Sequence, residues 1–192
     1  MEKIKLLGHT LAQLKDIAVG LGLPGFVGKQ MADWLYKKRV TQIDHMTNLS
    51  KAAREKLNER YVVGRTAYTQ VTVSKDGTKK YLFPSHTGTF IEAVMIPADD
   101  RYTLCVSSQA GCKMGCKFCM TGRMGFKGNL EVSEIISQYL EVDENNLLTN
   151  TVFMGMGEPL DNLDNVLQAI EVLISDWGFG WSPKRITLST IG

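Results

Sequence analysis

Apolar residues recur at helical spacing near the start of the chain. Between Leu11 and Leu21 they fall on one face of a helix, and Thr10 with Gln13 forms a capping-box pattern in front of it. The segment 20–28, rich in glycine and interrupted by proline, is predicted to break this helix. The pattern therefore predicts one amphipathic helix followed by a turn.

Two more helices are expected before residue 65. One begins at about Lys29, and Ser50 is placed to cap another that runs to about Arg60. We therefore expect a small helical module over residues 1–65, with its basic side chains left at the surface.

The chain then changes to the alternation typical of strands. Residues 68–73 and 80–83 flank an Asp-Gly pair at 76–77, which predicts a β-hairpin, and residues 90–96 predict a further strand. Residues 66–100 are therefore expected to form a hairpin and strand extension.

Strands and helices alternate from residue 101 onward, which predicts parallel βαβ units. The expected strands are 102–107, 151–154 and 185–189, and the expected helices are 132–140 and 163–174. Because the last strand would be left as a bare edge, we expect the natural protein to continue beyond Gly192.

Composition narrows the class of protein. The chain has 192 residues, of which 44% are hydrophobic, so it can bury a core. It has neither an apolar signal-peptide core nor an uncharged run of the roughly 20 residues that a membrane span needs. We expect a soluble, cytoplasmic protein without a membrane partner, in which the four cysteines stay reduced.

Charge is distributed unevenly. Residues 1–65 hold twelve Lys and Arg against six Asp and Glu, whereas residues 66–192 hold ten against fourteen. A basic module ahead of an acidic one is a plausible polyanion-binding arrangement, but charge alone favours an ordinary solvated basic face.

Three of the cysteines form a CxxxCxxC pattern, Cys112, Cys116 and Cys119. Three thiolates on one short loop can hold three corners of a cubane iron–sulfur cluster and leave the fourth iron open for a small chelating molecule. The alternative is a structural zinc site, with Cys105 or a histidine as the fourth ligand. Zinc sites usually pair two short ligand elements, and no second pair occurs here, so the spacing favours the cluster.

This loop, with Phe118 before its last cysteine, resembles the signature of the radical S-adenosylmethionine (SAM) superfamily. The surrounding sequence resembles the RlmN/Cfr family of RNA methyltransferases. The similar segments are 104–112, 128–130, 155–159 and 188–192, and, within the helical module, 23–24, Gln30, 34–36, 48–50 and Arg54. The resemblance implies an α/β fold, a partial radical SAM (β/α) barrel that begins at residue 101. The small helical domain and the hairpin extension would precede it.

The resemblance also implies a cofactor site. In the family, cysteines matching Cys112, Cys116 and Cys119 bind a [4Fe–4S] cluster, and SAM chelates its open iron and is cleaved to a 5′-deoxyadenosyl radical. Gly157, Glu158 and Ser189 match residues that contact SAM. Taken alone, the first two are typical of a strand-end turn, and Ser189 is an ordinary strand-end hydroxyl.

Two further positions acquire roles only through the resemblance. Glu92 matches the family's proton acceptor, although by itself it is typical of a solvent-facing strand residue. Cys105 matches a cysteine that helps release product through a transient disulfide bond with a methyl-carrying cysteine. That second cysteine has no match in this chain, so the chain alone is not expected to complete the reaction.

The implied function is methylation of adenosine C2 in 23S rRNA and tRNA, through the cluster and a methyl-cysteine intermediate. The expected partners are these RNAs and an electron donor such as flavodoxin, and the full-length enzyme is expected to be a monomer. Two alternatives stay open. One is methylation at C8, as in Cfr, and the other is a zinc-stabilised RNA-binding module without catalysis.

Overall fold

The structure, a computed structural model, describes residues 3–192, and these fall into two units. One unit combines the described residues up to Arg65 with Gln168–Trp181, and the other combines Thr66–Leu167 with Ser182–Gly192. Residues 66–100, expected as a separate extension, thus share one unit with residues 101–167 and 182–192 of the expected barrel segment 101–192. The reason is that a single hydrogen-bonded sheet runs through both of them.

The helical unit follows the predicted helices closely. Its elements are β1 (Ile4–Lys5), α1 (Leu11–Gly20), α2 (Phe26–Ala32), a π-helical turn (Asp33–Lys37), a 3-10 turn (Ile43–His45), α3 (Lys51–Arg60) and β2 (Tyr61–Val62). The capping box of Thr10 and Gln13 is confirmed, and the Ser50 side chain caps α3 by accepting from the Ala53 N–H at 3.2 Å. Local capping chemistry therefore sets both helix starts.

The start of the second helix was predicted wrongly. It begins at Phe26 rather than at about Lys29, so Gly28 lies inside a helix. A Cβ on Gly28 would stand 2.5 Å from the backbone nitrogen of Lys15. The glycine therefore permits close packing of α2 against α1 and does not act as a helix breaker here.

Aromatic packing explains why a distant segment belongs to the helical unit. Tyr36 is buried. Its hydroxyl donates to the His9 carbonyl at 2.5 Å and accepts from the Gly8 N–H at 3.1 Å. Its ring lies 5.7 Å from that of Trp177 and 6.4 Å from that of Phe179. These contacts bury large apolar rings that neither segment could cover alone.

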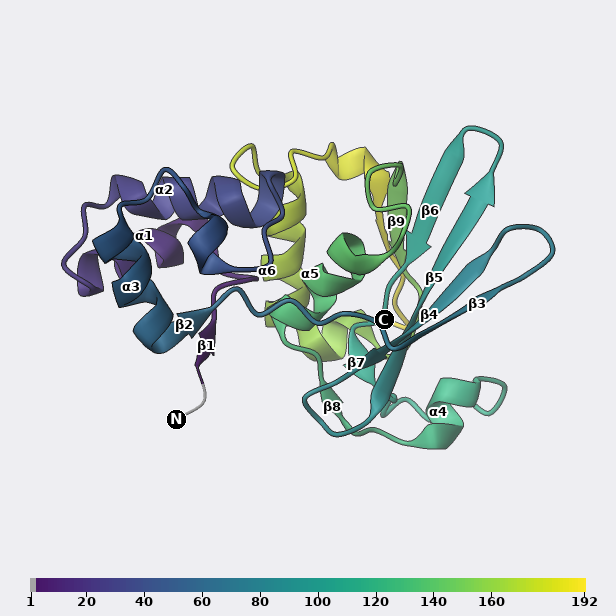
Figure 1. The fold of residues 1–192 in the computed structure, drawn as a ribbon. Helices are drawn as coiled ribbons and strands as arrows, with labels where there is room; N and C mark the ends of the chain where they lie inside the picture. Colours follow the sequence, from purple (N-terminus) through teal and green to yellow (C-terminus); the bar gives the residue numbers. More distant parts are fainter. Residues whose placement is uncertain (1–2) are drawn as a thin grey trace. The chain divides into compact units, whose positions relative to one another are not determined.

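The second unit is built on a six-stranded sheet in the order β10-β9-β6-β5-β4-β3 (Figure 1). The strands are β3 (Gln70–Val73), β4 (Lys79–Pro84), β5 (Phe90–Ala98), β6 (Arg101–Cys105), β9 (Asn150–Phe153) and β10 (Ile186–Leu188). The first four pair antiparallel, whereas β6, β9 and β10 run parallel, which confirms the predicted βαβ order.

Helices and short elements complete this unit. They are β7 (Gln109–Ala110), α4 (Met120–Met124), β8 (Gly128–Asn129), α5 (Val132–Glu141), α6 (Leu163–Ile174) and 3-10 turns at Pro159–Asn162 and Pro183–Arg185. From Gln168 onward, α6 belongs to the helical unit. Sequence patterns did not predict α4, β7 or β8, because each is too short to show a periodicity.

Helix α5 is joined to the sheet by buried polar contacts. The Tyr139 hydroxyl lies 3.0 Å from the Thr151 hydroxyl on β9. The Gln138 side chain accepts from the Ser107 N–H at 2.9 Å and donates to the Ser107 carbonyl at 3.0 Å. Gln138 and Ser107 are both fully buried. The Gln138 side-chain amide therefore bonds the backbone groups of Ser107 that a neighbouring strand would otherwise bond.

No helix in the described part of the chain combines the length and the apolar character that crossing a membrane would require.

We expect Gln138→Leu to lower the free energy of unfolding by about 1–3 kcal/mol, because the backbone polar groups of Ser107 would lose their buried partners. Equilibrium unfolding in urea measures this loss. Gln70→Leu is the matched control, since Gln70 is exposed on the edge strand β3. Equal losses in the two variants would contradict the structural role given to Gln138.

Candidate functional site

The three-cysteine segment is a loop closed at its base by strands. Residues 111–127 connect β7 with β8, which pair antiparallel, and the Lys127 N–H donates to the Ala110 carbonyl at 2.8 Å. Gly111 has a φ of +75°, and a Cβ at this position would overlap the carbonyl oxygen of Gly125. Glycine is therefore required where the two ends of the loop cross.

The loop directs backbone N–H groups at sulfur. The Met114 N–H lies 3.5 Å from the Sγ of Cys112. Backbone hydrogen bonds from Gly122 and Thr121 hold the pKa of the Cys119 thiol below its ordinary value, although burial opposes them. Such donors stabilise thiolates, which are the form that binds metal.

The donor set fits an iron–sulfur cluster. All four cysteines are free and partly exposed, and the Sγ atoms of Cys112, Cys116 and Cys119 do not all lie within 4.8 Å of one another. Thiolates on one zinc ion would be about 3.8 Å apart. In a cubane each thiolate binds a different iron, and this allows wider spacing.

A cavity of about 610 Å³ adjoins this loop and contains Glu92 in its wall. One wall comes from β4, β5 and their connecting turn, and the other includes Met120, Met124 and Met156. The Glu92 carboxylate forms an ion pair of 3.0 Å with Lys80, which also lines the cavity. Glu92 thus lines a partly apolar cavity beside the cysteine loop, and its side chain is partly exposed to solvent.

The Gly157–Glu158 turn lies next to the start of the cysteine loop. Gly157 has a φ of +101°, and a Cβ there would stand 2.5 Å from the Cβ of Gln109 on β7. The Glu158 N–H donates to the Gln109 Oε1 at 2.9 Å. The turn and the loop are therefore held together by direct contact.

The Glu158 carboxylate is buried, and hydrogen bonds from other residues of the chain replace contact with water. It accepts from the Thr190 hydroxyl at 2.6 Å and from the N–H groups of Ile191 and Leu160 at 3.0 Å each. Burial raises the pKa of this carboxyl, but these hydrogen bonds outweigh burial and leave the pKa below its ordinary value.

The two remaining predicted residues lie at strand ends. Ser189 follows β10 and is exposed, and the next residue, Thr190, contacts Glu158. Cys105 ends β6, and burial raises the pKa of its thiol despite a backbone hydrogen bond from Met154. No disulfide joins the cysteines of this chain, so the structure gives no support to a disulfide bond at Cys105.

Two contributors to the site were missed in the sequence. Gln109 is fully buried, and Asp161 accepts from Gln109 Nε2 at 2.6 Å and from Lys113 Nζ at 3.0 Å. The hydrogen bond from Gln109, followed by that from Lys113, lowers the pKa of the Asp161 carboxyl. No periodicity marks such residues, because their partners lie about 50 positions away in the chain.

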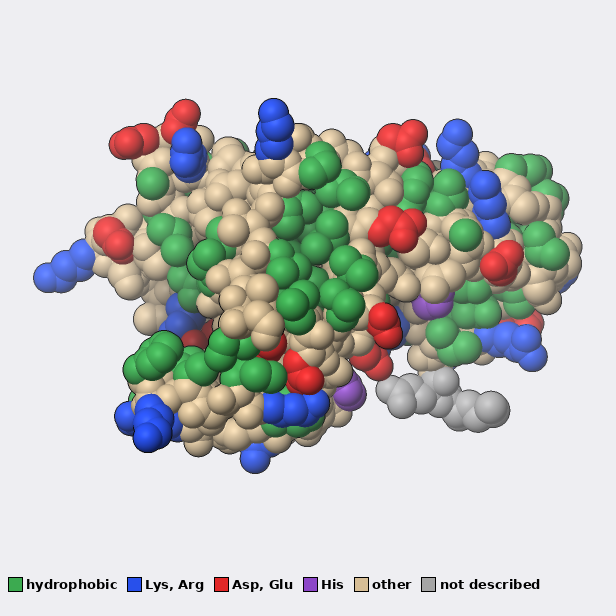
Figure 2. Space-filling view, turned by 180° about the vertical axis from the view of Figure 1, so that it is seen from behind, with side chains coloured by type: hydrophobic (Ala, Val, Ile, Leu, Met, Phe, Trp, Pro, Cys, Tyr) green, Lys and Arg blue, Asp and Glu red, His purple; other side chains and the backbone are tan. Residues whose placement is uncertain are grey.

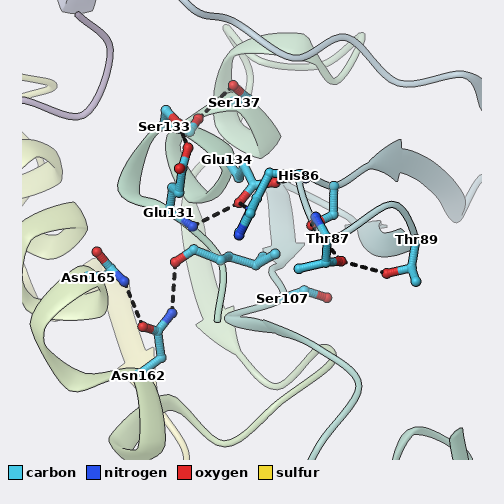
Figure 3. A network of polar contacts seen from close by, with 12 residues as sticks. His86, Thr87, Thr89, Ser107, Glu131, Ser133, Glu134, Ser137, Asn162 and Asn165 are labelled. Atoms are coloured by element: carbon cyan, nitrogen blue, oxygen red, sulfur yellow. Dashed lines mark hydrogen bonds and ion pairs between the residues drawn. The ribbon is translucent and has the colours of Figure 1, made fainter. Parts of the chain in front are cut away.

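A separate group of possible metal ligands lies at the start of α5. Among residues 3–192, only His86, Glu131 and Glu134 bring three such atoms within 4.8 Å of one another. Glu134 is already engaged, since it accepts from the backbone and ring nitrogens of His86 and from the Glu131 N–H, each at 2.8 Å (Figure 3). The group therefore caps α5 and anchors the β4–β5 turn that lines the cavity.

The cysteine loop exposes four large apolar side chains. Phe118, Met120, Met124 and Met114 are 92%, 69%, 54% and 38% exposed, respectively. Figure 2 shows hydrophobic side chains gathered on the lobe that carries α4. A water-exposed group of this kind is typical of a surface that meets a ligand or a partner.

Comparison with known proteins agrees with this geometry. Residues 4–63 match the family described as ribosomal RNA large subunit methyltransferase N-terminal domain, and residues 106–192 match the radical SAM superfamily. The chain is 35% identical to a radical SAM methyltransferase from Sphaerobacter thermophilus of known crystal structure, with a TM-score of 0.89. The match covers 98% of this chain and 57% of that one. The expected radical SAM fold is thereby confirmed.

Curated relatives point in the same direction. A probable dual-specificity RNA methyltransferase RlmN from Porphyromonas gingivalis is 56% identical, over 100% of this chain and 54% of its own length. The dual-specificity RNA methyltransferase RlmN from Dichelobacter nodosus is 46% identical, over 100% of this chain and 55% of its own length. The chain thus spans about half the length of the curated relatives it matches.

We expect Gly111→Ala to lower the free energy of unfolding by more than about 2 kcal/mol. Alanine would have to adopt the left-handed backbone conformation, and its Cβ would also overlap the Gly125 carbonyl oxygen. Gly115→Ala is the control. Its φ is +61°, but its Cβ would make only an ordinary contact of 4.0 Å with the Lys113 carbonyl oxygen, so only the backbone cost of about 1–2 kcal/mol applies. Urea unfolding compares the two, and a larger loss for Gly115→Ala would contradict the described loop closure.

Proposed function

We propose, from the similarity of the whole chain to RlmN RNA methyltransferases and of residues 106–192 to the radical SAM superfamily, that it carries the cofactor site of these enzymes. Cys112, Cys116 and Cys119 would hold a [4Fe–4S] cluster. The observation that carries the proposal is the three-cysteine loop, closed by Gly111 and placed against the Gly157–Glu158 turn. It lies within the segment that matches the radical SAM superfamily.

SAM would bind beside the loop. A bound cluster with an open iron would supply the electron for reductive cleavage of SAM. Gly157 permits the close approach of Gln109 that keeps the turn next to the cysteine loop. The low pKa of Glu158 keeps its carboxylate charged, which suits the ammonium group of SAM. Ser189 offers an exposed hydroxyl directly before Thr190, which contacts Glu158.

The cavity wall suggests where the substrate base would lie. The methionine side chains offer an apolar surface for a planar base, and Glu92 places a carboxylate at the same cavity. We assign Glu92 as the proton acceptor, with Lys80 holding the carboxylate in place at 3.0 Å. Cys105 is assigned to product release together with a methyl-carrying cysteine outside this chain.

The proposed substrates are 23S rRNA and tRNA, methylated at C2 of adenosine by the full-length protein. The basic residues of the helical unit would contact phosphates of the RNA. We further propose a cytoplasmic monomer that receives electrons from a donor such as flavodoxin. Methylation at C8 is an outcome that the assay below distinguishes.

Anaerobic reconstitution tests the cofactor site. We expect a brown chain with about four iron and four sulfide, and we expect Cys112→Ala to lose most of both. Cys105→Ala is the control, because Cys105 lies outside the loop, and it should retain its iron. A colourless chain that binds zinc under these conditions would refute the cluster and favour a structural zinc module.

Glu92→Gln tests the proton acceptor. In the full-length protein we expect methylation of RNA to fall at least about 100-fold, since a general base contributes that much or more. Iron content should be unchanged. Glu171→Gln, at an exposed position on α6, should keep full activity. Mass mapping of the product RNA reports both the rate and the methylated ring carbon, and full activity of Glu92→Gln would exclude the assigned role.

A further inference from the structure

The side chain of Gln109 joins three segments of the site. Its Oε1 accepts from the Glu158 N–H at 2.9 Å, and its Nε2 donates to Asn129 Oδ1 at 2.8 Å and to Asp161 Oδ2 at 2.6 Å. Gln109 is completely buried. A buried amide with its oxygen and nitrogen both engaged has a single stable orientation, so it fixes the segments it contacts.

Asp161 extends this network to the cysteine loop. Its two carboxylate oxygens lie 3.0 and 3.2 Å from Lys113 Nζ, and its side chain is 24% exposed. The same ammonium group lies 4.4 Å from the centre of the Phe126 ring. Lys113 follows Cys112 directly, and Phe126 lies at the far end of the loop. Asp161 thus contacts Lys113 at one end of the loop, and through Lys113 it is linked to Phe126 at the other end.

The secondary structure at the base of the loop and within it is short. β7 and β8 at its base have two residues each, and the helix inside it, α4, has five residues, none of them buried. So short a ladder contributes few hydrogen bonds. The contacts of Lys113 and Asp161 are therefore a large part of what orients the loop.

We infer that Asp161 is a positioning residue of the cysteine loop, which it holds through Lys113 against the Gly157–Glu158 turn. The inference concerns the orientation of the loop before any cofactor binds. Its relevance to a cluster and to SAM rests on the proposed function. Asp161 itself makes no contact with cysteine sulfur and is not assigned a catalytic role.

Hydrogen–deuterium exchange of the metal-free chain tests the inference directly. The substitution Asp161→Asn keeps a side-chain oxygen that can accept from Gln109 but removes the ion pair with Lys113. In Asp161→Asn we expect amide exchange over residues 111–127 to rise about fivefold or more, with exchange in α5 unchanged. Lys113→Met should give the same pattern, and the double variant should add nothing further, because both changes break one contact.

Asp164→Asn is the matched control. It removes the same charge three residues along, at an exposed position on α6, and exchange in the loop should not change. Unchanged loop exchange in Asp161→Asn would overturn the inference. So would a rise throughout the sheet unit, because that outcome indicates general destabilisation, or additive effects in the double variant.

Iron retention links the result to the proposed function. After anaerobic reconstitution, we expect Asp161→Asn to contain normal iron at the start and to release it to a chelator about threefold faster than the unsubstituted chain. Equal release rates would overturn the role toward the cluster. If the unsubstituted chain binds no iron, the proposed function fails, and the exchange measurement alone decides the inference.

Discussion

The structure depends on hydrogen bonds to the buried backbone of residues 106–110. This short stretch follows β6 and has few strand partners. Its polar groups find partners across the chain instead. Gln138 serves both the N–H and the carbonyl of Ser107, the Met156 carbonyl accepts from Ser108 and Gln109, and Asn162 donates to the Ser108 carbonyl. Because unpaired buried groups are costly, this stretch has one stable path. That path delivers the chain to the first cysteine of the loop.

Much of the fold could be predicted from the sequence, because its signals are local. Helical spacing in α5 and α6, the cap at Ser50 and the Asp-Gly turn at 76–77 each depend on neighbours within four residues. The start of α2 was missed because Gly28 is there for close packing against Lys15, and a local pattern does not show such a contact. The sharing of one sheet by the hairpin and the parallel strands was likewise set by pairing of β5 with β6.

The site divides in the same way. The spacing of Cys112, Cys116 and Cys119 can be seen in the sequence because a loop ligand set is contiguous. The role of Glu92 was predicted through the family resemblance alone, because local sequence does not show where its side chain lies. It lies on β5, and only the sheet order brings that strand to the cavity beside the loop. No role was predicted for Gln109 or Asp161, because neither residue type is distinctive until its distant partners are known.

The exposed methionines around the cavity have a consequence for how air affects the protein. Met120 and Met124 line the cavity and are more than half exposed, so their thioethers are open to oxidants. Conversion to the sulfoxide would turn this apolar wall polar. Oxygen damage at the site would therefore have two chemically separate parts, one at the thiolates and one at the thioethers. Only the second calls for an enzymatic sulfoxide reductase to reverse it.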